Sequence, residues 1–182
     1  MDGKPSEWTP VLSGVPEGSI GGPLLFICFT ADLPRLINTN CLMFADDIKL
    51  FHRVRCNSDA TALQNDLERL AAWSRTWRLK LNPQKCITIS FTLKRSPLIG
   101  KYVLDGSQLE RTHQTRDLGV ILDEKLSFLP HIDATVSKAN RMLGLLMRSM
   151  QLSRNHSRLQ HKSLISAYNA QVRSVIEYGC VV

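Results

Sequence analysis

The sequence predicts an α+β fold, because short alternating apolar segments, hairpin-like turns and longer stretches with helical periodicity occur along one chain of 182 residues. Hydrophobic residues make up 43% and charged residues 21%, which is ordinary globular composition and argues against disorder. The longest nearly continuous apolar run, Pro23 to Phe29, is far shorter than the roughly 20 residues that span a bilayer. The N-terminus has no apolar signal-peptide core. We therefore expect an intracellular protein, cytoplasmic or nuclear, with no membrane partner.

The cysteines indicate reduced thiols. Their number is odd, no two of them stand at Cys-x-x-Cys spacing, and none has a well-placed histidine, so a zinc site and a disulfide framework are both poor interpretations. The five are Cys28, Cys41, Cys56, Cys86 and Cys180.

The first elements are a turn-rich loop, a helix and a hairpin. Residues 13–19 are rich in glycine and proline and end in Ser19, which predicts a helix cap. The apolar segment from Ile20 to about Leu33 predicts a buried helix, with Pro23 tolerated in its first turn. Cys41 to Phe51 predicts a hairpin whose apolar arms flank a polar tip.

A longer helix follows. Ser58 or Asp59 would cap it, and it would run to about Arg78 before the break at Asn82-Pro83. Its apolar residues recur at three- and four-residue steps and predict core packing: Leu63, Leu67, Leu70, Trp73 and Trp77.

The rest of the chain predicts short strands and then two helices. Cys86 to Phe91 alternates like a strand, and Asp105-Gly106 predicts a hairpin between Tyr102–Leu104 and Gln108–Glu110. Leu118 to Leu122 predicts another strand. The two helices would occupy about His131–Met150 and Ser157–Tyr178.

Asp46 and Asp47 are the residues best suited to chemistry. Adjacent carboxylates repel each other and need solvent or cations to offset that repulsion. At the tip of a hairpin anchored by apolar arms they could hold Mg²⁺ or Mn²⁺, which prefer oxygen ligands and accept substrate phosphates. The alternative is a solvated Asp-Asp turn, which the tetrapeptide Phe44-Ala45-Asp46-Asp47 alone favours.

The C-terminal part is basic. The formal net charge is +7, and residues 138–173 contain no acidic side chain. Such a stretch would favour a polyanion through counterion release, although a solvated helix face would look the same. The candidate nucleic-acid contacts are Lys138, Arg141, Arg148, Arg154, Arg158 and Lys162, followed by Arg173.

Four segments, in one order along the chain, resemble the reverse transcriptases of non-LTR retrotransposons, and most closely those of jockey-like elements. They are Gly14-Val15-Pro16-Glu17-Gly18-Ser19 with Gly22-Pro23-Leu24-Leu25, then Phe44-Ala45-Asp46-Asp47, then Trp73…Trp77 with Leu79 to Cys86, and Leu118 to Asp123 with Leu126-Ser127-Phe128. The last segment is similar to the hairpin that grips the primer end. One such match would be weak, whereas four in order are specific.

The resemblance implies roles for individual residues. Asp46, with Asp47 beside it, would ligate the divalent metals, Mg²⁺ or Mn²⁺, of a two-metal nucleotidyl transfer. Lys85 would neutralise charge or donate a proton near the triphosphate, and a solvated lysine is the equal alternative. The partners would be an RNA template, a DNA primer and deoxynucleoside triphosphates. The nucleotide and template pocket would be lined by Gly14, Val15, Pro16, Glu17, Gly18 and Ser19, with Phe44 and Ala45.

The resemblance also implies a domain layout. Residues 1–128 would form a partial polymerase palm, and residues 129–182 a truncated, basic, helical thumb-like region. Glu17 stands where the family carries glutamine, which should weaken nucleotide binding because an ionised glutamate only accepts hydrogen bonds. In the family, the first catalytic aspartate and the fingers region lie N-terminal to the segment that corresponds to Gly14–Ser19.

We therefore expect an RNA-directed DNA polymerase by lineage that is inactive alone, because the first catalytic aspartate and the fingers are missing from this sequence. The strand that carries this aspartate would come either from a partner or from an upstream segment of the same polyprotein. The alternatives are a non-catalytic nucleic-acid-binding remnant that acts through the basic helices, and the product of a degraded element without selected function.

Overall fold

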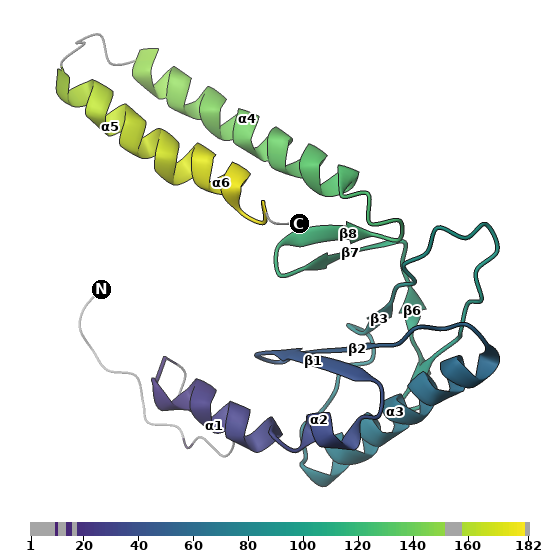
Figure 1. The fold of residues 1–182 in the computed structure, drawn as a ribbon. Coiled ribbons are helices and arrows are strands. Elements are labelled where there is room, and N and C mark those ends of the chain that lie inside the picture. Colours follow the sequence, from purple (N-terminus) through teal and green to yellow (C-terminus); the bar gives the residue numbers. More distant parts are fainter. Residues whose placement is uncertain (1–9, 11–13, 16–17, 152–157, 181–182) are drawn as a thin grey trace. The chain divides into compact units, whose positions relative to one another are not determined.

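The computed structural model describes residues 10, 14–15, 18–151 and 158–180, with no account of side chains at 150–151 and 158–161 (Figure 1). It divides into two compact units, which we describe separately. Unit 1 is Met1–Pro83 with Gly100–Gln108, and unit 2 is Gln84–Ile99 with Leu109–Val182. The mixture of helices and small sheets confirms the α+β class. In the described part of the chain, no helix combines the length and apolarity that crossing a membrane requires.

Unit 1 begins with two short helices, α1 (Gly21–Thr30) and α2 (Leu33–Leu36). Ser19 caps α1 as predicted, since its hydroxyl accepts the N–H of Gly22 at 3.0 Å. The prediction of one continuous helix to Leu33 is wrong because Pro34, in the first turn of α2, has no N–H to donate to Thr30 and its ring would clash with that carbonyl.

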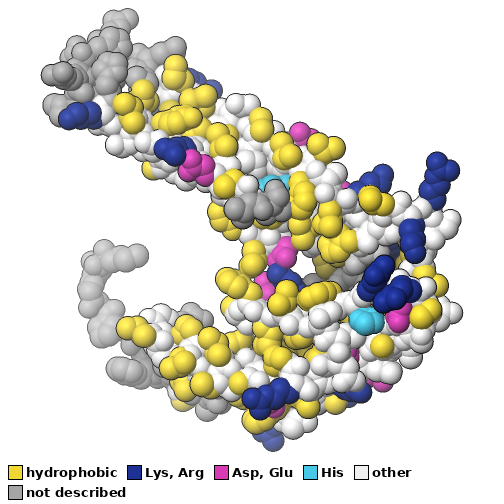
Figure 2. All heavy atoms as spheres, viewed as in Figure 1, with side chains coloured by type: hydrophobic (Ala, Val, Ile, Leu, Met, Phe, Trp, Pro, Cys, Tyr) yellow, Lys and Arg dark blue, Asp and Glu magenta, His cyan; other side chains and the backbone are white. Residues whose placement is uncertain are grey.

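The prediction that this helix is buried is also wrong. Leu24 and Ile27 are each 64% exposed, and hydrophobic side chains gather on the surface where α1 lies (Figure 2). Helix α1 carries no charged residue and is apolar on all sides. One side packs, where Phe29 meets the rings of Trp73 and Trp77 edge-on, and the other sides have no described neighbour that buries them.

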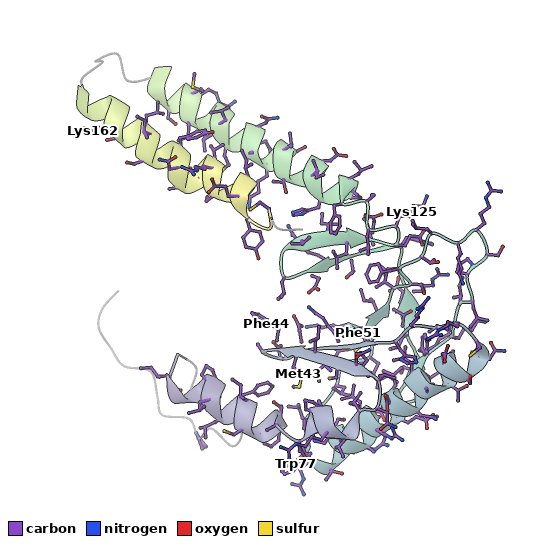
Figure 3. The ribbon with its side chains drawn as sticks, viewed as in Figure 1. Met43, Phe44, Phe51, Trp77, Lys125 and Lys162 are labelled. Carbon is purple, nitrogen blue, oxygen red and sulfur yellow. The ribbon has the colours of Figure 1, made fainter. Side chains whose placement is uncertain are left out.

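The predicted hairpin is present as β1 (Asn40–Phe44) and β2 (Asp47–Phe51). Side chains alternate between the two faces of a strand, and Met43 and Phe44 accordingly project to opposite sides of β1 (Figure 3). The inner face joins a core built on Leu33, Ile37, Leu70 and Trp73. The partly buried residues packed against that core are Cys41, Met43, Ile48, Leu50, Leu79 and Leu81.

Helix α3 (Asn57–Thr76) follows the hairpin. Its N-cap is Cys56 rather than Ser58 or Asp59, while Asp59 completes the capping box by accepting the N–H of Cys56 at 3.3 Å. The predicted core stripe is confirmed at Leu67, Leu70 and Trp73, whereas Trp77 at the helix end is 45% exposed. The helix ends where Arg78 turns to a φ of +56°, before it reaches Asn82-Pro83.

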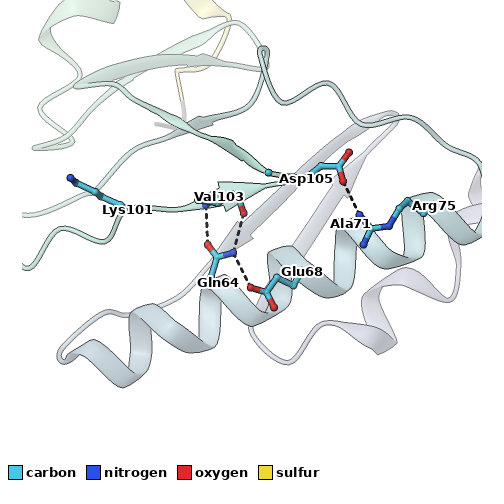
Figure 4. A pocket seen from close by; sticks show the side chains of 8 residues that line it. Gln64, Glu68, Ala71, Arg75, Lys101, Val103 and Asp105 are labelled. Atoms are coloured by element: carbon cyan, nitrogen blue, oxygen red, sulfur yellow. Dashed lines mark hydrogen bonds and ion pairs between the residues drawn. The ribbon is translucent and has the colours of Figure 1, made fainter.

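Two small sheets follow. The turn at Asp105-Gly106 joins β4 (Val103–Leu104) to β5 (Ser107–Gln108), as predicted. Gln64 of α3 docks this hairpin, because its amide accepts the Val103 N–H at 2.9 Å and donates to the Val103 carbonyl at 3.0 Å (Figure 4). In unit 2, the strand predicted over residues 86–91 is shorter: β3 (Ile87–Thr88) pairs in parallel with β6 (Glu110–Arg111).

The rest of unit 2 is a hairpin and a helical pair. Strands β7 (Gln114–Asp117) and β8 (Val120–Asp123) are joined at Leu118-Gly119, so these two residues form a turn and not the strand that their apolar run predicts. Both residues have positive φ, +44° and +87°, which excludes extended backbone. Helix α4 (Leu129–Gln151) then lies beside α5 (Arg158–Tyr168), the π-helix η1 (Asn169–Arg173) and α6 (Ser174–Glu177) (Figure 1).

Candidate functional site

The two candidate carboxylates stand at the tip of the β1–β2 hairpin. Phe44 pairs with Asp47, so only Ala45 and Asp46 form the turn. Ala45 has a φ of +51°, a left-handed conformation that is uncommon for a residue with a side chain. Asp46 and Asp47 are both exposed and adjacent, whereas the arms behind them are fixed to the core. The turn therefore presents both carboxylates to solvent from a rigid base.

A buried carboxylate anchors the start of this hairpin. Asp66 of α3 is fully buried and accepts the backbone N–H groups of Thr39, at 2.6 Å, and Asn38, at 3.0 Å. The guanidinium of Arg69 donates to the same carboxylate at 2.7 Å. These bonds connect the residues before β1 to the middle of α3, and they hold the hairpin in register with the helix beneath it.

The environment of Asp66 shifts its own pKa and that of a neighbour. Burial alone raises the pKa of the Asp66 carboxyl, but the bonds from Thr39, Asn38 and Arg69 to its charged form outweigh burial, and the pKa lies below its ordinary value. Burial also raises the pKa of the Cys41 thiol on the inner face of the hairpin, and the negative charge of Asp66 adds to that rise. Cys41 is thus a neutral core residue.

The two carboxylates at the tip suit a divalent cation that is also coordinated by water and substrate. They are too few for a metal site formed by protein ligands alone. Two carboxylates supply hard oxygen ligands, and Mg²⁺ characteristically completes its coordination with waters and substrate phosphates. Across residues 18–151 and 158–180, no three side chains of His, Cys, Asp or Glu come together as a potential metal cluster. The exposed carboxylates of the described hairpin tip are those of Asp46 and Asp47.

The predicted nucleotide loop is only partly within the described residues. Gly14 and Gly18 have positive φ, +93° and +75°, and among the described residues no atom apart from those of the adjoining residues lies within 4 Å of the position a Cβ would take at either. Val15 is exposed, and Ser19 is the helix cap described above. Pro16 and Glu17 lie outside the described residues. At Gly14 and Gly18 the backbone therefore adopts conformations that favour glycine.

Lys85 lies on an exposed turn before β3, in unit 2. The hairpin tip belongs to unit 1. The structure therefore groups Phe44, Ala45, Asp46 and Asp47 within one element, and the role of Lys85 stays a prediction.

Three of the predicted basic residues share one exposed face of α4. Lys138, Arg141 and Arg148 are spaced three and seven residues apart, which places them along one side of a helix. Lys162 is exposed on α5 (Figure 3). Arg158 begins α5, and Arg154 lies outside the described residues. Arg173 forms an ion pair with Glu177, in which its Nε lies 2.6 Å from Oε1 of the glutamate.

A hollow in unit 1 is lined by side chains that dock one element on another. It lies between α3 and the β4–β5 hairpin and has a volume of about 600 Å³ (Figure 4). Gln64 of its lining is paired with Val103, and Arg75 is paired with Asp105 at 2.7 Å. These groups hold the β4–β5 hairpin on α3.

The sequence did contain a signal for Asp66, which we did not identify as a site-supporting residue. It stands on the same side of α3 as Leu63 and Leu70, three residues after one and four before the other. A carboxylate within an apolar helix stripe is expensive to bury unless several donors meet it. That pattern predicts a structural anchor, although not the partners it finds.

Comparisons with known proteins agree with the motifs. The family model described as "Reverse transcriptase (RNA-dependent DNA polymerase)" matches residues 1–129. The chain is 43% identical, over 148 residues, to a probable RNA-directed DNA polymerase from transposon BS of Drosophila melanogaster, which covers 74% of this chain and 16% of that protein. It is 32% identical to the RNA-directed DNA polymerase from mobile element jockey of Drosophila funebris, over 91% of this chain and 19% of that protein.

The chain thus spans less than a fifth of the length of these two relatives. No solved structure matches it significantly. The family match covers more than half of the chain, and the matched region contains the hairpin that presents Asp46 and Asp47. The chain therefore belongs to the reverse transcriptase family, in the group that includes the RNA-directed DNA polymerases of jockey-like non-LTR retrotransposons.

Proposed function

We propose that this chain contributes the metal-binding hairpin of an RNA-directed DNA polymerase, with Asp46 and Asp47 as ligands for Mg²⁺ or Mn²⁺. The observation that carries the proposal is the two-residue turn, which exposes both carboxylates while the inner face of its arms is packed in the core. The substrates would be deoxynucleoside triphosphates, and the partners an RNA template and a DNA primer.

In this proposal the chain's own residues bind and orient the substrate. Asp46 and Asp47 hold the cation, which when bound supplies Lewis acidity at the attacking hydroxyl and the leaving pyrophosphate. The glycines of residues 14–19 let the backbone approach the incoming nucleotide closely. Lys85 neutralises charge on the triphosphate or donates a proton to it. Residues 1–128 would form the palm portion and residues 129–182 the thumb-like portion.

Metal binding at the tip is the direct test. Titrating Mn²⁺ into the protein should broaden the amide resonances of Ala45, Asp46 and Asp47 first, because a paramagnetic ion relaxes the nuclei nearest to it. Asp46→Asn should abolish this selective broadening. Asp105→Asn, which alters an exposed carboxylate at another hairpin turn, is the matched control and should leave it intact. Broadening that persists in Asp46→Asn would refute the site.

Polymerisation tests the wider proposal. The family's first catalytic aspartate, which joins the pair equivalent to Asp46 and Asp47, lies upstream of the segment that Gly14 opens. The 182-residue polypeptide by itself should therefore yield no templated product in primer extension with Mg²⁺ or Mn²⁺. An upstream segment of the same polyprotein, added in trans, should restore extension that depends on Asp46. Products from the polypeptide alone that disappear in Asp46→Asn would overturn the proposed inactivity and support the two-carboxylate site.

The basic face of α4 favours a second candidate function, nucleic-acid binding without catalysis. Lys138, Arg141 and Arg148 line one exposed side of the helix. Each neutralised phosphate changes the slope of log affinity against log salt by about 0.9 for duplex DNA. Replacing all three residues by glutamine should therefore flatten that slope by about 3. Arg35→Gln in unit 1 and Asp46→Asn should not change it. An unchanged slope in the triple variant would exclude this face as the binding surface.

A further inference from the structure

The side chain of Tyr178, near the end of the described residues, contacts the β7–β8 turn. The hydroxyl of Tyr178 donates a hydrogen bond of 2.5 Å to the carbonyl of Leu118, which lies 60 residues earlier. Leu118 adopts a φ of +44°, and it is 45% exposed. Both residues belong to unit 2. This contact joins the end of the helical pair to the tip of a hairpin far away in the sequence.

The ring of Tyr178 also fits a space that only glycine leaves open. A Cβ at Gly119 would lie 2.8 Å from Cε1 of Tyr178 and 3.0 Å from its hydroxyl oxygen. Gly119 has a φ of +87°, so the turn conformation and the ring contact both require a residue without a side chain. The tyrosine therefore packs on the turn as well as bonding to it.

A second set of contacts holds the β8 strand behind the turn. A Cβ at Gly179 would lie 3.2 Å from Cγ2 of Val120 and 3.7 Å from Nε2 of His131. The ring nitrogen Nδ1 of His131, in the first turn of α4, accepts the N–H of Ile121 at 3.4 Å. The hairpin is thus gripped from both members of the helical pair, by His131 of α4 and by Tyr178 after α6.

The π-helix η1 explains how the chain end reaches the turn. A π-helical turn contains an extra residue relative to an α-helix, and this residue rotates everything that follows about the helix axis. Within η1, Val172 is buried at 3% exposure, so the segment stays packed while the phase changes. Four residues of α6 then lead to Tyr178 and Gly179. The irregular segment therefore sets the direction in which Tyr178 meets Leu118.

We infer that Tyr178 is a positioning residue that latches the β7–β8 turn to the helical pair α4–α6, so that nucleic acid bound by the helices also orders the turn. The choice of nucleic acid as the ligand rests on the proposed function, whereas the latch itself does not. The β7–β8 turn belongs to the segment that resembles a primer-gripping hairpin. Without Tyr178, this hairpin would be held by the pairing of its two short strands and by the bond from Ile121 to His131, which lies behind the turn.

The latch is tested first without any ligand. Amide hydrogen exchange at Gly119 and Val120 should be about tenfold faster in Tyr178→Phe, the factor that loss of one hydrogen bond from local opening produces. Tyr168→Phe removes a hydroxyl from another half-exposed tyrosine of the helical pair and should leave both rates unchanged. Equal rates in the wild type and in Tyr178→Phe would overturn the latch. Gly119→Ala should displace the ring and speed exchange in the same way.

The coupling is tested with a DNA primer annealed to an RNA template. In the wild type this duplex should slow exchange at Gly119 and Val120, and in Tyr178→Phe it should not, although it still binds. Equal protection in both proteins would overturn the coupling. Absence of any binding would overturn nucleic acid as the ligand, and the ligand-free rates would still decide whether Tyr178 is a latch.

Discussion

The backbone N–H of Thr39 donates a hydrogen bond of 2.6 Å to the buried carboxylate of Asp66. This bond connects the residue before β1 to the centre of α3, and with the bond from Asn38 it satisfies N–H groups that the hairpin cannot satisfy itself. The position of the exposed pair Asp46 and Asp47 therefore depends on a third aspartate that has no contact with solvent.

Replacing Asp66 by asparagine should destabilise unit 1. Asparagine keeps the shape of the side chain but replaces one carboxylate oxygen with an NH₂ group. That donor would face another donor, either the Arg69 guanidinium or a backbone N–H. We expect the free energy of unfolding to fall by about 2 kcal/mol, the range for hydrogen bonds to a charged group. Urea denaturation measures this loss. Glu68→Gln, two residues along on the exposed side, should stay within about 0.5 kcal/mol of the wild type. An equal loss in both variants would contradict the anchor.

Acid should weaken the protein partly through the same carboxylate. Because the pKa of Asp66 is lowered in the folded state, its stabilisation is complete above the pKa of the unfolded chain, about 3.9 for an aspartate. It is lost as pH falls through the lower folded pKa. The free energy of unfolding should therefore fall more between pH 6 and pH 3 in the wild type than in Asp66→Asn.

The same comparison isolates Asp66 from the other carboxyls. The pKa values of Asp59, Asp123 and Glu124 are also lowered, by hydrogen bonds that outweigh any burial, and those groups remain in both proteins. Parallel pH profiles for the wild type and Asp66→Asn would mean that Asp66 titrates alike in the folded and unfolded chains.

Ala45 should tolerate glycine and reject a β-branched residue. Its φ of +51° costs an L-residue about 1–2 kcal/mol, and glycine escapes that cost but gains freedom in the unfolded chain. Ala45→Gly should therefore change the free energy of unfolding by less than about 0.5 kcal/mol. Ala45→Val should lower it measurably, because a β-branched side chain fits the left-handed region worse than the methyl group of alanine does. Chemical denaturation distinguishes the two. A harmless valine would show that the turn is not held in this conformation.

Gln64 should hold the β4–β5 hairpin on α3 through both the oxygen and the nitrogen of its side-chain amide. Gln64→Glu keeps the acceptor for the Val103 N–H but loses the donor to the Val103 carbonyl. Gln64→Ala loses both. We expect losses in the free energy of unfolding of about 1 and about 2 kcal/mol respectively, with faster hydrogen exchange at Val103 only in the alanine variant. Similar exchange in both variants would assign the docking to other contacts.

Much of the fold follows from local sequence. The hairpins at residues 40–51 and 103–108 were predictable because their turn residues and alternating arms agree. The stripe of α3 was predictable because its helical spacing places Leu67, Leu70 and Trp73 on one side, and all three are buried. The family of the candidate site was also predictable, since the order of four motifs is specific. The roles of Asp46, Asp47 and Lys85 stay predictions.

The wrong predictions share a physical cause, because a local sequence pattern does not show which distant residues will pack against it. The apolar run at residues 20–33 predicted burial, yet burial requires a neighbouring surface, and the described residues leave Leu24 and Ile27 mostly exposed. Leu118-Gly119 continued an apolar run but forms a turn, whose conformation is supported by Tyr178 from the far end of the chain. Asp66 and Tyr178 act through partners 27 and 60 residues away.

The pairing of Phe44 with Asp47 limits how this hairpin could change in length. Strand side chains alternate, so inserting or deleting one residue in an arm would exchange its inner and outer faces. Cys41 and Met43 would then turn to solvent, and Leu42 and Phe44 would turn to the core. Lineages descended from this chain should therefore accept new side chains along the arms far more readily than single-codon gains or losses, and any length change that survives should add or remove residues in pairs.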